Sequence, residues 1–319
     1  MTNYQDTQFL RALGMLLIIN SHMYDYYPIP YVGTGGALGN SIFFFFSAYG
    51  IYLSQQKSRK PFSEWFKGRI SRIYPSIWIV LIFLKMPIML ILGNFNADYI
   101  ITFIGQFFNP PHWFLRLLLV YYLLSFFLLK AEQKNKLFCM FGVLGILYFA
   151  LYFSWLDLSK WTVEDQPFKL IHYFMIFLFG IYVAIKNKSI TYTGSHNYTV
   201  LLLLVALVYG HKFLMTKGLY PEFQFIQQAA MYPILYYLLK ISRSPFVSVR
   251  LMQSKMISSV VEFISNHSLE LYIVQETIVH QVLKLNFPFP LNMITFIVLT
   301  FIISAIVNKI SGIIRDKIN

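Results

Sequence analysis

The chain has 319 residues, of which 57% are hydrophobic and only 12% are charged. Soluble domains carry about 25% charged residues, so this composition excludes an ordinary soluble protein and indicates an integral membrane protein. The formal charge of +13 would suggest nucleic acid as a partner of a soluble chain, but here we interpret it as a topology signal and expect no nucleic acid. Cys139 is the single cysteine, which excludes an intramolecular disulfide and a cysteine-rich metal site.

Ten apolar runs of about 17–24 residues recur along the chain, each long enough to cross a membrane as a helix. The predicted spans are 7–27, 37–55, 73–93, 112–130, 136–156, 168–186, 198–215, 223–240, 264–284 and 291–314. The first run lacks a basic leader and a small-residue cleavage site, so we expect it to be retained. Because the connections are short, the sequence predicts an all-α, polytopic helix bundle in one domain, 1–319.

Lysine and arginine are distributed unevenly between the connections. Fifteen follow the second, fourth, sixth and eighth spans, whereas the alternate connections hold five. The C-terminal end adds Lys309, Arg315 and Lys317. Because basic residues are enriched on the cytoplasmic side of membrane proteins, we predict that both termini are cytoplasmic.

The first predicted span carries two ionisable residues, Arg11 and His22. Eleven residues of α-helix turn through about 1100°, within about 20° of three full turns, so the two side chains share a face about 16 Å apart. An arginine at mid-membrane costs about 2.5–3.5 kcal/mol, so the pair predicts a cavity enclosed by protein. Taken singly, Arg11 could be a snorkelling anchor and His22 an interhelical hydrogen-bonding residue.

The segment RISRIYP places Arg69 and Arg72 three residues apart at the start of the third span. This spacing puts both guanidinium groups on one side of a helix. Paired guanidinium groups suit phosphates, either of a cytoplasmic cofactor or of a lipid. The alternative is a topology anchor that touches anionic lipid.

Two further segments carry polar residues inside apolar runs. Trp113 and Arg116 open the fourth span; the tryptophan is typical of an aromatic belt, whereas the arginine, one turn into the helix, indicates a cavity or an anionic partner. In the ninth span Glu276 and His280 are four residues apart and face the same way. An ionisable residue inside a span indicates a functional site, but Glu276 could equally be the structural partner of Arg116 or Lys85.

Five segments, in chain order, resemble motifs of one known family. Arg11 and His22 form R-x(10)-H, and GTGGALGNSIFFFFSAYGIYLS is similar to the family's second-span pattern of glycines, double Phe, Ser and a small residue. RISRIYP resembles R-x-x-R-I-x-P, HWFLRLLLVYYLL resembles the Trp-Phe-Leu start of the fourth span, and SLELYIVQ resembles the late S-L-x-x-Y-L-x-H. Over nearly its full length the chain is similar to the acyltransferase family 3 membrane proteins, which move acyl groups, mostly acetyl, onto extracytoplasmic sugars.

Two positions depart from the pattern of that family. Gln275 stands where a histidine is usual, and Ala48 stands where a glycine usually follows Ser47. A subset of the family has an acidic residue beyond the Trp-Phe-Leu of the fourth span. Here that part reads LLLV, which is closer to the branch that acts on surface polysaccharides without an attached domain.

The resemblance implies a ten-helix unit in the bacterial cytoplasmic membrane, with His22 as the essential residue. It implies acetyl-CoA or another acyl-CoA as a donor presented from the cytoplasm, and no permanently bound cofactor. The expected partners are this donor, a polysaccharide or lipid-linked glycan as acceptor, membrane lipids, and the machinery of polysaccharide synthesis.

The resulting hypothesis is an O-acetyltransferase that moves an acetyl group from cytoplasmic acetyl-CoA to a hydroxyl of an extracytoplasmic or lipid-linked polysaccharide. Arg11, Arg69 and Arg72 would hold the CoA phosphates at the inner face, while the pantetheine arm reaches toward His22. The imidazole could act as general base on a sugar hydroxyl or accept the acyl group itself.

Three more residues are assigned to the acceptor in this hypothesis. Trp113 would stack against a sugar ring, Arg116 would bind an anionic group, and Glu276 would orient the imidazole or bind acceptor hydroxyls. The remaining histidines have no metal-ligand spacing, and no metal is assigned to them: His172, His196, His211 and His267.

Two other functions fit the composition. A transporter or flippase could move a glycan, a lipid-linked sugar or a small anion through the same polar cavity, and it would consume no acyl-CoA. A structural partner of a polysaccharide-synthesis machine would use the polar residues only to pack helices, so substituting them would have little effect on chemistry.

Overall fold

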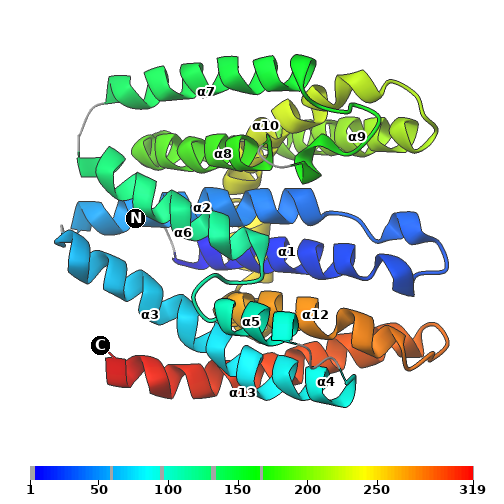
Figure 1. The fold of residues 1–319 in the computed structure, drawn as a ribbon. Coiled ribbons are helices and arrows are strands. Elements are labelled where there is room, and N and C mark those ends of the chain that lie inside the picture. Colours follow the sequence, from blue (N-terminus) through cyan, green and yellow to red (C-terminus); the bar gives the residue numbers. More distant parts are fainter. Residues whose placement is uncertain (1–3, 58–59, 94–96, 131–133, 166–167, 319) are drawn as a thin grey trace. The chain divides into compact units, whose positions relative to one another are not determined.

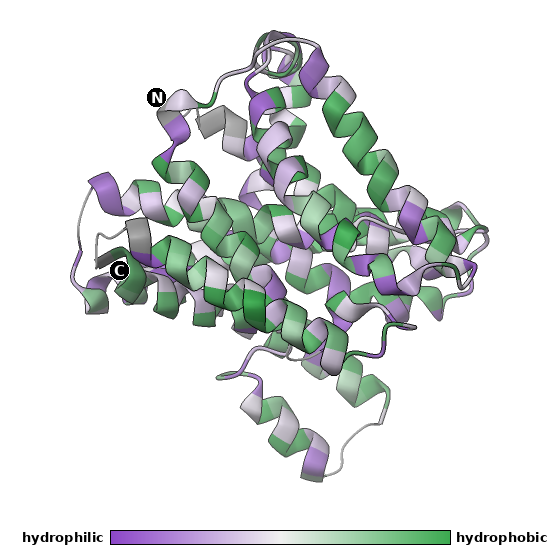
Figure 2. Cartoon of the chain, turned by 90° about the horizontal axis from the view of Figure 1, so that it is seen from above, coloured by the Kyte–Doolittle hydropathy of each residue, from purple (hydrophilic) through white to green (hydrophobic). Residues whose placement is uncertain are grey.

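The structure is a computed structural model that describes residues 4–57, 60–93, 97–130, 134–165 and 168–318. Helices make up 83% of it, and the described residues contain no β-strand. The predicted all-α fold is therefore confirmed. Hydrophobic residues recur along the helices, and hydrophilic residues are frequent near their ends (Figure 2).

Thirteen α-helices are present in the described ranges (Figure 1). They are α1 Tyr4–His22, α2 Gly36–Lys57, α3 Phe62–Val80, α4 Met86–Ile91, α5 Ala97–Gly105, α6 Trp113–Lys130, α7 Lys134–Ser154, α8 Phe168–Ile185, α9 His196–Thr216, α10 Gln224–Ser242, α11 Lys255–Asn266, α12 Ser268–Leu283 and α13 Leu291–Ile318. A π-helical turn, Leu81–Lys85, joins α3 directly to α4, and another, Phe246–Leu251, follows α10.

Each of the ten predicted spans coincides with helical structure, although two of them differ in detail. The third is part of one continuous run, Phe62–Ile91, and the ninth is interrupted between α11 and α12 at His267. The nine-residue helix α5 was not predicted because it is too short to cross a membrane.

Six helical runs among the described residues are long and apolar enough to cross a membrane, which supports a multi-pass membrane protein. They are Pro30–Lys57, Phe62–Ile91, Lys136–Ser154, Phe168–Ile185, His196–Thr216 and Leu291–Ile318.

The chain forms two compact units, each assembled from separate stretches. Unit 1 comprises Met1–Arg11, Asn40–Arg59 and Tyr121–Val261. Unit 2 comprises Ala12–Gly39, Lys60–Val120 and Glu262–Asn319.

Aromatic side chains of α2 and α8 form much of the core of unit 1. Phe44 and Phe45 are fully buried, and the ring of Phe44 lies 5.1 Å from the rings of both Tyr121 and Tyr173. α8 is apolar and buried on nearly all sides, as expected of a helix surrounded by protein. In the same unit α8 packs on α7 and α10, and α9 packs on α10.

In unit 2 the helices α3, α12 and α13 pack against one another (Figure 1). A buried hydrogen bond joins two of them, because the hydroxyl of Ser76 in α3 donates to Oε1 of Glu270 in α12 at 2.7 Å. Glu270 is therefore buried with a partner, which is the condition for a carboxyl group inside an apolar bundle.

The first two helices approach closely at Gly39. A Cβ atom added there would lie 2.6 Å from both the carbonyl oxygen of Gly14 and the side chain of Ile18, so a larger residue would push the backbones apart. At Gly50, further along the same helix, an added Cβ would meet no other described atom within 4 Å.

We expect Gly39→Ala to lower the thermal unfolding temperature of the detergent-solubilised protein, and Gly50→Ala to keep or raise it. Alanine gains about 1 kcal/mol of helix propensity over glycine, whereas overpacking costs about 1–3 kcal/mol. If both variants unfolded at the same temperature, the close approach of α1 and α2 would be refuted.

Candidate functional site

His22 is the last residue of α1, and the loop that follows is fastened to the same end of the helix. The amide nitrogen of Asn20 donates to the carbonyl oxygens of Val32 and Thr34, both at 2.8 Å. The hydroxyl of Tyr27 donates to the side-chain oxygen of Asn20 at 2.7 Å. One asparagine therefore closes the loop over the helix end that carries His22.

The same loop is anchored on the last two helices of unit 2. The buried hydroxyl of Tyr26 donates to the carbonyl oxygen of Val279 in α12 at 2.6 Å, and its ring packs on Phe296 of α13 at 5.1 Å. His22 consequently lies close enough to Glu276 and His280 for their charges to act on its imidazole. The end of α1 and helix α12 therefore lie close together within unit 2.

Three side chains, two on α3 and one in the π-helical turn, donate hydrogen bonds to residues 106–108. The hydroxyl of Tyr74 donates to the carbonyl oxygen of Phe108 at 2.7 Å, and Nε1 of Trp78 donates to that of Phe107 at 3.0 Å. The ammonium group of Lys85 donates to Oε1 of Gln106 at 2.8 Å. These three bonds fix the chain just before Pro110 and Pro111, which lead into His112.

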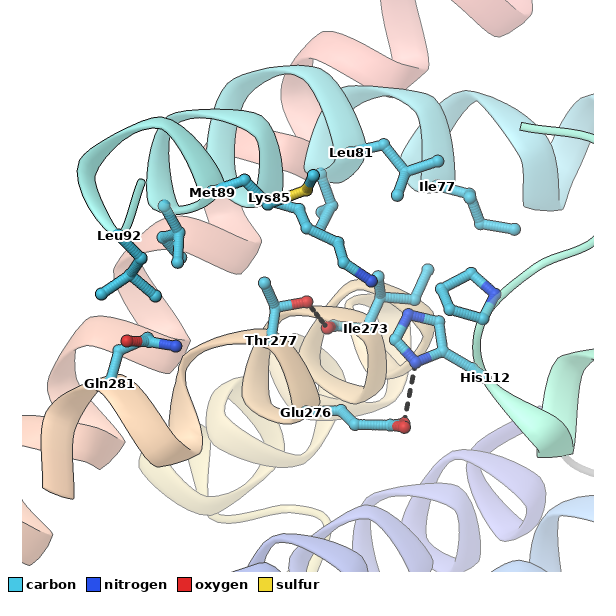
Figure 3. Close-up of a pocket in the computed structure, with 13 residues that line it drawn as sticks. Ile77, Leu81, Lys85, Met89, Leu92, His112, Ile273, Glu276, Thr277 and Gln281 are labelled. Atoms are coloured by element: carbon cyan, nitrogen blue, oxygen red, sulfur yellow. Dashed lines mark hydrogen bonds and ion pairs between the residues drawn. The ribbon is translucent and has the colours of Figure 1, made fainter. Parts of the chain in front are cut away.

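His112 and Glu276 form the central contact of the site (Figure 3). Nδ1 of the imidazole lies 2.8 Å from Oε2 of the carboxyl group, and the side chains are 6% and 33% exposed. The ring of Tyr272 contacts His112 edge to face at 5.8 Å, and its hydroxyl interacts with the carboxyl group of Glu276. This partly buried pair brings an imidazole and a carboxylate to one point.

A cavity of about 260 Å³ opens beside this pair. Its polar lining residues are Lys85, His112, Glu276, Thr277 and Gln281, and the rest of its wall is apolar. The hydroxyl of Thr277 donates to the carbonyl oxygen of Ile273 one turn back in α12, so it is satisfied within its own helix. The charge of Lys85 is near enough to Glu276 for the two to interact electrostatically.

The partner of Glu276 differs from the two that the sequence suggested. Glu276 pairs with His112, whereas Lys85 bonds to Gln106 and the Arg116 side chain is exposed. His112 was missed because it reads as an ordinary residue at the start of the fourth span. A carboxylate inside an apolar run, which requires a partner, together with a histidine directly before Trp-Phe-Leu, was the signal that could have found it.

The predicted phosphate-binding residues lie away from the cavity. Arg72 is exposed on α3, and the guanidinium group of Arg69 lies 5.4 Å from the ring centroid of Trp65. Along the continuous helical run, Arg72 is about 20 Å from Lys85. Arg11 lies on α1 and belongs to unit 1, and its role in holding the CoA phosphates stays a prediction.

Trp113 follows His112 directly and is half-buried, with its ring edge to face on Phe114 at 6.1 Å. Trp113 and Arg116 occupy the first turn of α6, within unit 2. Their assignments to an acceptor stay predictions. In the described part of the chain no group of three His, Cys, Asp or Glu side chains could hold a metal ion.

Both departures from the family pattern are buried. Gln275 is 0% exposed, and neither its amide nitrogen nor its oxygen has a hydrogen-bond partner among the described residues. Ala48 is fully buried opposite Gly180, where an added Cβ would lie 3.1 Å from its methyl group. A small residue at position 48 is therefore needed for α2 to pack on α8.

We expect Tyr26→Phe to destabilise the protein by about 0.5–1.5 kcal/mol, because the hydroxyl that ties the end of α1 to α12 is lost. Tyr24→Phe is the matched control, since Tyr24 lies in the same short 3₁₀ turn and is exposed. Thermal unfolding in detergent compares the two. Equal unfolding temperatures would show that the Tyr26 bond does not hold the loop.

Comparison with known proteins gives one match. The family model described as an acyltransferase domain, that of acyltransferase family 3, matches residues 6–309, which is essentially the whole chain. No curated protein and no solved structure matches it. The matched region contains every residue of the site, from His22 at the end of α1 to Glu276 in α12. The chain therefore belongs to acyltransferase family 3.

Proposed function

We propose that this protein is a membrane O-acyltransferase that moves an acetyl group from cytoplasmic acetyl-CoA to a hydroxyl of an extracytoplasmic or lipid-linked polysaccharide. The observation that carries the proposal is the hydrogen-bonded pair of His112 and Glu276 at the wall of a cavity, with His22 near enough for their charges to act on it, in a chain whose family is an acyltransferase family. Imidazole and carboxylate are the groups that acyl transfer to a hydroxyl requires.

The proposed topology has ten membrane spans and both termini in the cytoplasm of a bacterium. It rests on the excess of lysine and arginine in the alternate connections and on the helices that coincide with the predicted spans. In this orientation Arg69 and Arg72 lie at the cytoplasmic face and the end of α1 that carries His22 lies in the outer half of the membrane.

The distance along α3 fits a donor that reaches across much of the membrane. Arg72 and Lys85 are separated by about 20 Å of helix, compared with a hydrocarbon core of about 30 Å. A CoA thioester held by its phosphates at Arg69 and Arg72 would extend its pantetheine arm toward the cavity. The acyl carbonyl would then arrive near His22, where the imidazole acts as base or as acyl carrier.

We expect His22→Ala to reduce acetyl transfer by at least about 100-fold while the protein still inserts and folds. The measurement uses purified protein in lipid vesicles with labelled acetyl-CoA and a mixture of candidate glycans, and it follows CoA release and label on sugar. His196→Gln is the control, because this exposed histidine lies at the start of α9 in unit 1. Full activity of His22→Ala would refute the role of His22.

The same assay separates an enzyme from a transporter. If the unmodified protein consumes no acetyl-, succinyl- or longer acyl-CoA, the acyltransferase proposal fails, and transport of a glycan or anion through the cavity becomes the better explanation.

We expect Arg72→Ala to raise the KM for acyl-CoA about tenfold with little change in kcat, because a charge-assisted bond to a phosphate contributes about 1.5–3 kcal/mol. Lys67→Ala is the matched control, since Lys67 is also exposed on α3. Steady-state kinetics at varied acyl-CoA concentration distinguish the two variants. If Arg72→Ala and Lys67→Ala raised the KM for acyl-CoA equally, the result would indicate a general effect of surface charge and not a phosphate site.

A further inference from the structure

We propose that His112 is the general base that removes the proton from the acceptor hydroxyl in the cavity, and that Glu276 is its positioning residue. The inference rests on the proposed acyltransferase function and assigns a second imidazole to it. His22 then serves the acyl group, and His112 serves the hydroxyl that receives it.

The hydrogen-bond geometry leaves one nitrogen of His112 available for this role. Nδ1 contacts the carboxyl group of Glu276 at 2.8 Å, so Nε2 is the remaining nitrogen. In Figure 3 the remaining nitrogen points toward the ammonium group of Lys85, at the wall of the cavity. A neighbouring cation disfavours a proton at Nε2, whereas the carboxylate favours a proton at Nδ1. The neutral ring therefore presents a lone pair at Nε2.

Burial fixes the orientation of this imidazole. His112 is 6% exposed, its ring lies edge to face on Tyr272, and two prolines precede it. A carboxylate that holds the far side of a buried imidazole sets its tautomer and stabilises the imidazolium formed during proton transfer. Glu276 meets this description, and the acceptor hydroxyl would occupy the place of the nucleophile.

The size and lining of the cavity limit what the acceptor can be. Its volume of about 260 Å³ lies just below the range of about 300–1,000 Å³ that is usual for drug-sized ligands, so it fits one hydroxyl-bearing ring better than a long polymer segment. The cavity wall combines the polar residues named above with apolar side chains. One sugar unit of a glycan, with its hydroxyl toward Nε2, is the class of substrate that matches.

Transfer moves one acyl group and one proton. The acceptor O–H bond breaks, its proton moves to Nε2 of His112, and the oxygen forms an ester bond with the acyl carbon. In direct transfer the bond from the acyl carbon to the CoA sulfur breaks, and the thiolate takes the proton from His112. If His22 carries the acyl group, the carbon–nitrogen bond breaks instead, and His112 passes its proton to the leaving nitrogen of His22, which gave its own proton to the CoA thiolate when the acyl group was loaded.

Several groups face the pair and will influence its titration. Lys85 and Glu276 carry the fixed charges, and the remaining groups are His22, His280 and the hydroxyl of Tyr272. Replacing Glu276 by glutamine removes the negative charge but keeps an oxygen that can accept from Nδ1. The imidazolium of His112 is then less favoured, so the acid limb of the pH profile of kcat/KM for the acceptor should move to lower pH.

The test measures donor and acceptor chemistry separately in vesicles with labelled acetyl-CoA and the glycan that the unmodified protein accepts. We expect His112→Gln to lower kcat for transfer by about 100- to 10,000-fold with the KM for acetyl-CoA unchanged, as is typical for loss of a general base. Glu276→Gln should lower kcat less and shift the pH profile. Because His112 and Glu276 act together, the variant that carries both substitutions should transfer acetyl no more slowly than His112→Gln alone.

Two control variants match these changes in side-chain chemistry. His196→Gln replaces an exposed histidine, and Glu262→Gln neutralises an exposed carboxylate of α11; both should keep the rate and the pH profile. If Glu276→Gln also keeps the rate and the pH profile of the unmodified protein, the proposal is overturned. The same holds if His112→Gln transfers acetyl at the rate of the unmodified protein. Should His112→Gln fail to fold, the pH profile of Glu276→Gln still decides. Failure of the unmodified protein to consume any acyl-CoA refutes the broader function instead.

Discussion

A carboxylate inside an apolar helix bundle requires a partner, because lipid and hydrocarbon side chains cannot replace the water it has lost. Glu276 finds this partner in His112, and Glu270, on the same helix, finds one in Ser76. The two contacts join α12 to α3 and to the segment before α6. A single requirement of membrane electrostatics therefore determines both how unit 2 packs and where its reactive groups meet.

The site depends on backbone segments outside the long helices. The loop after α1 is held by Asn20 and Tyr26, and the segment before His112 is held by side chains of α3 and of the π-helical turn. Irregular backbone inside a membrane protein must satisfy its polar groups from neighbouring side chains. Here the same bonds that satisfy these carbonyl groups also place His22 and His112.

The sequence was sufficient to locate the long helices and most of the ionisable residues of the candidate site, because long apolar runs and isolated charges are local signals. His22 and Glu276 were identified in this way. The pairing of Glu276 with His112 was not, since the two residues are 164 positions apart and only tertiary packing brings them together. The break at His267 falls in the polar residues 265–268, which the predicted span 264–284 included at its start.

The π-helical turn Leu81–Lys85 interrupts the regular α-helical geometry of the continuous run Phe62–Ile91. A π-turn contains about one residue more than an α-turn, so the chain could lose one residue here and continue as a regular α-helix. The length of the helix would barely change, and the residues after the turn would keep their orientation, because the wide turn holds the additional residue. A one-residue deletion at this turn would therefore be tolerated, whereas the same deletion elsewhere in the run Phe62–Ile91 would rotate all following residues by about 100° about the helix axis.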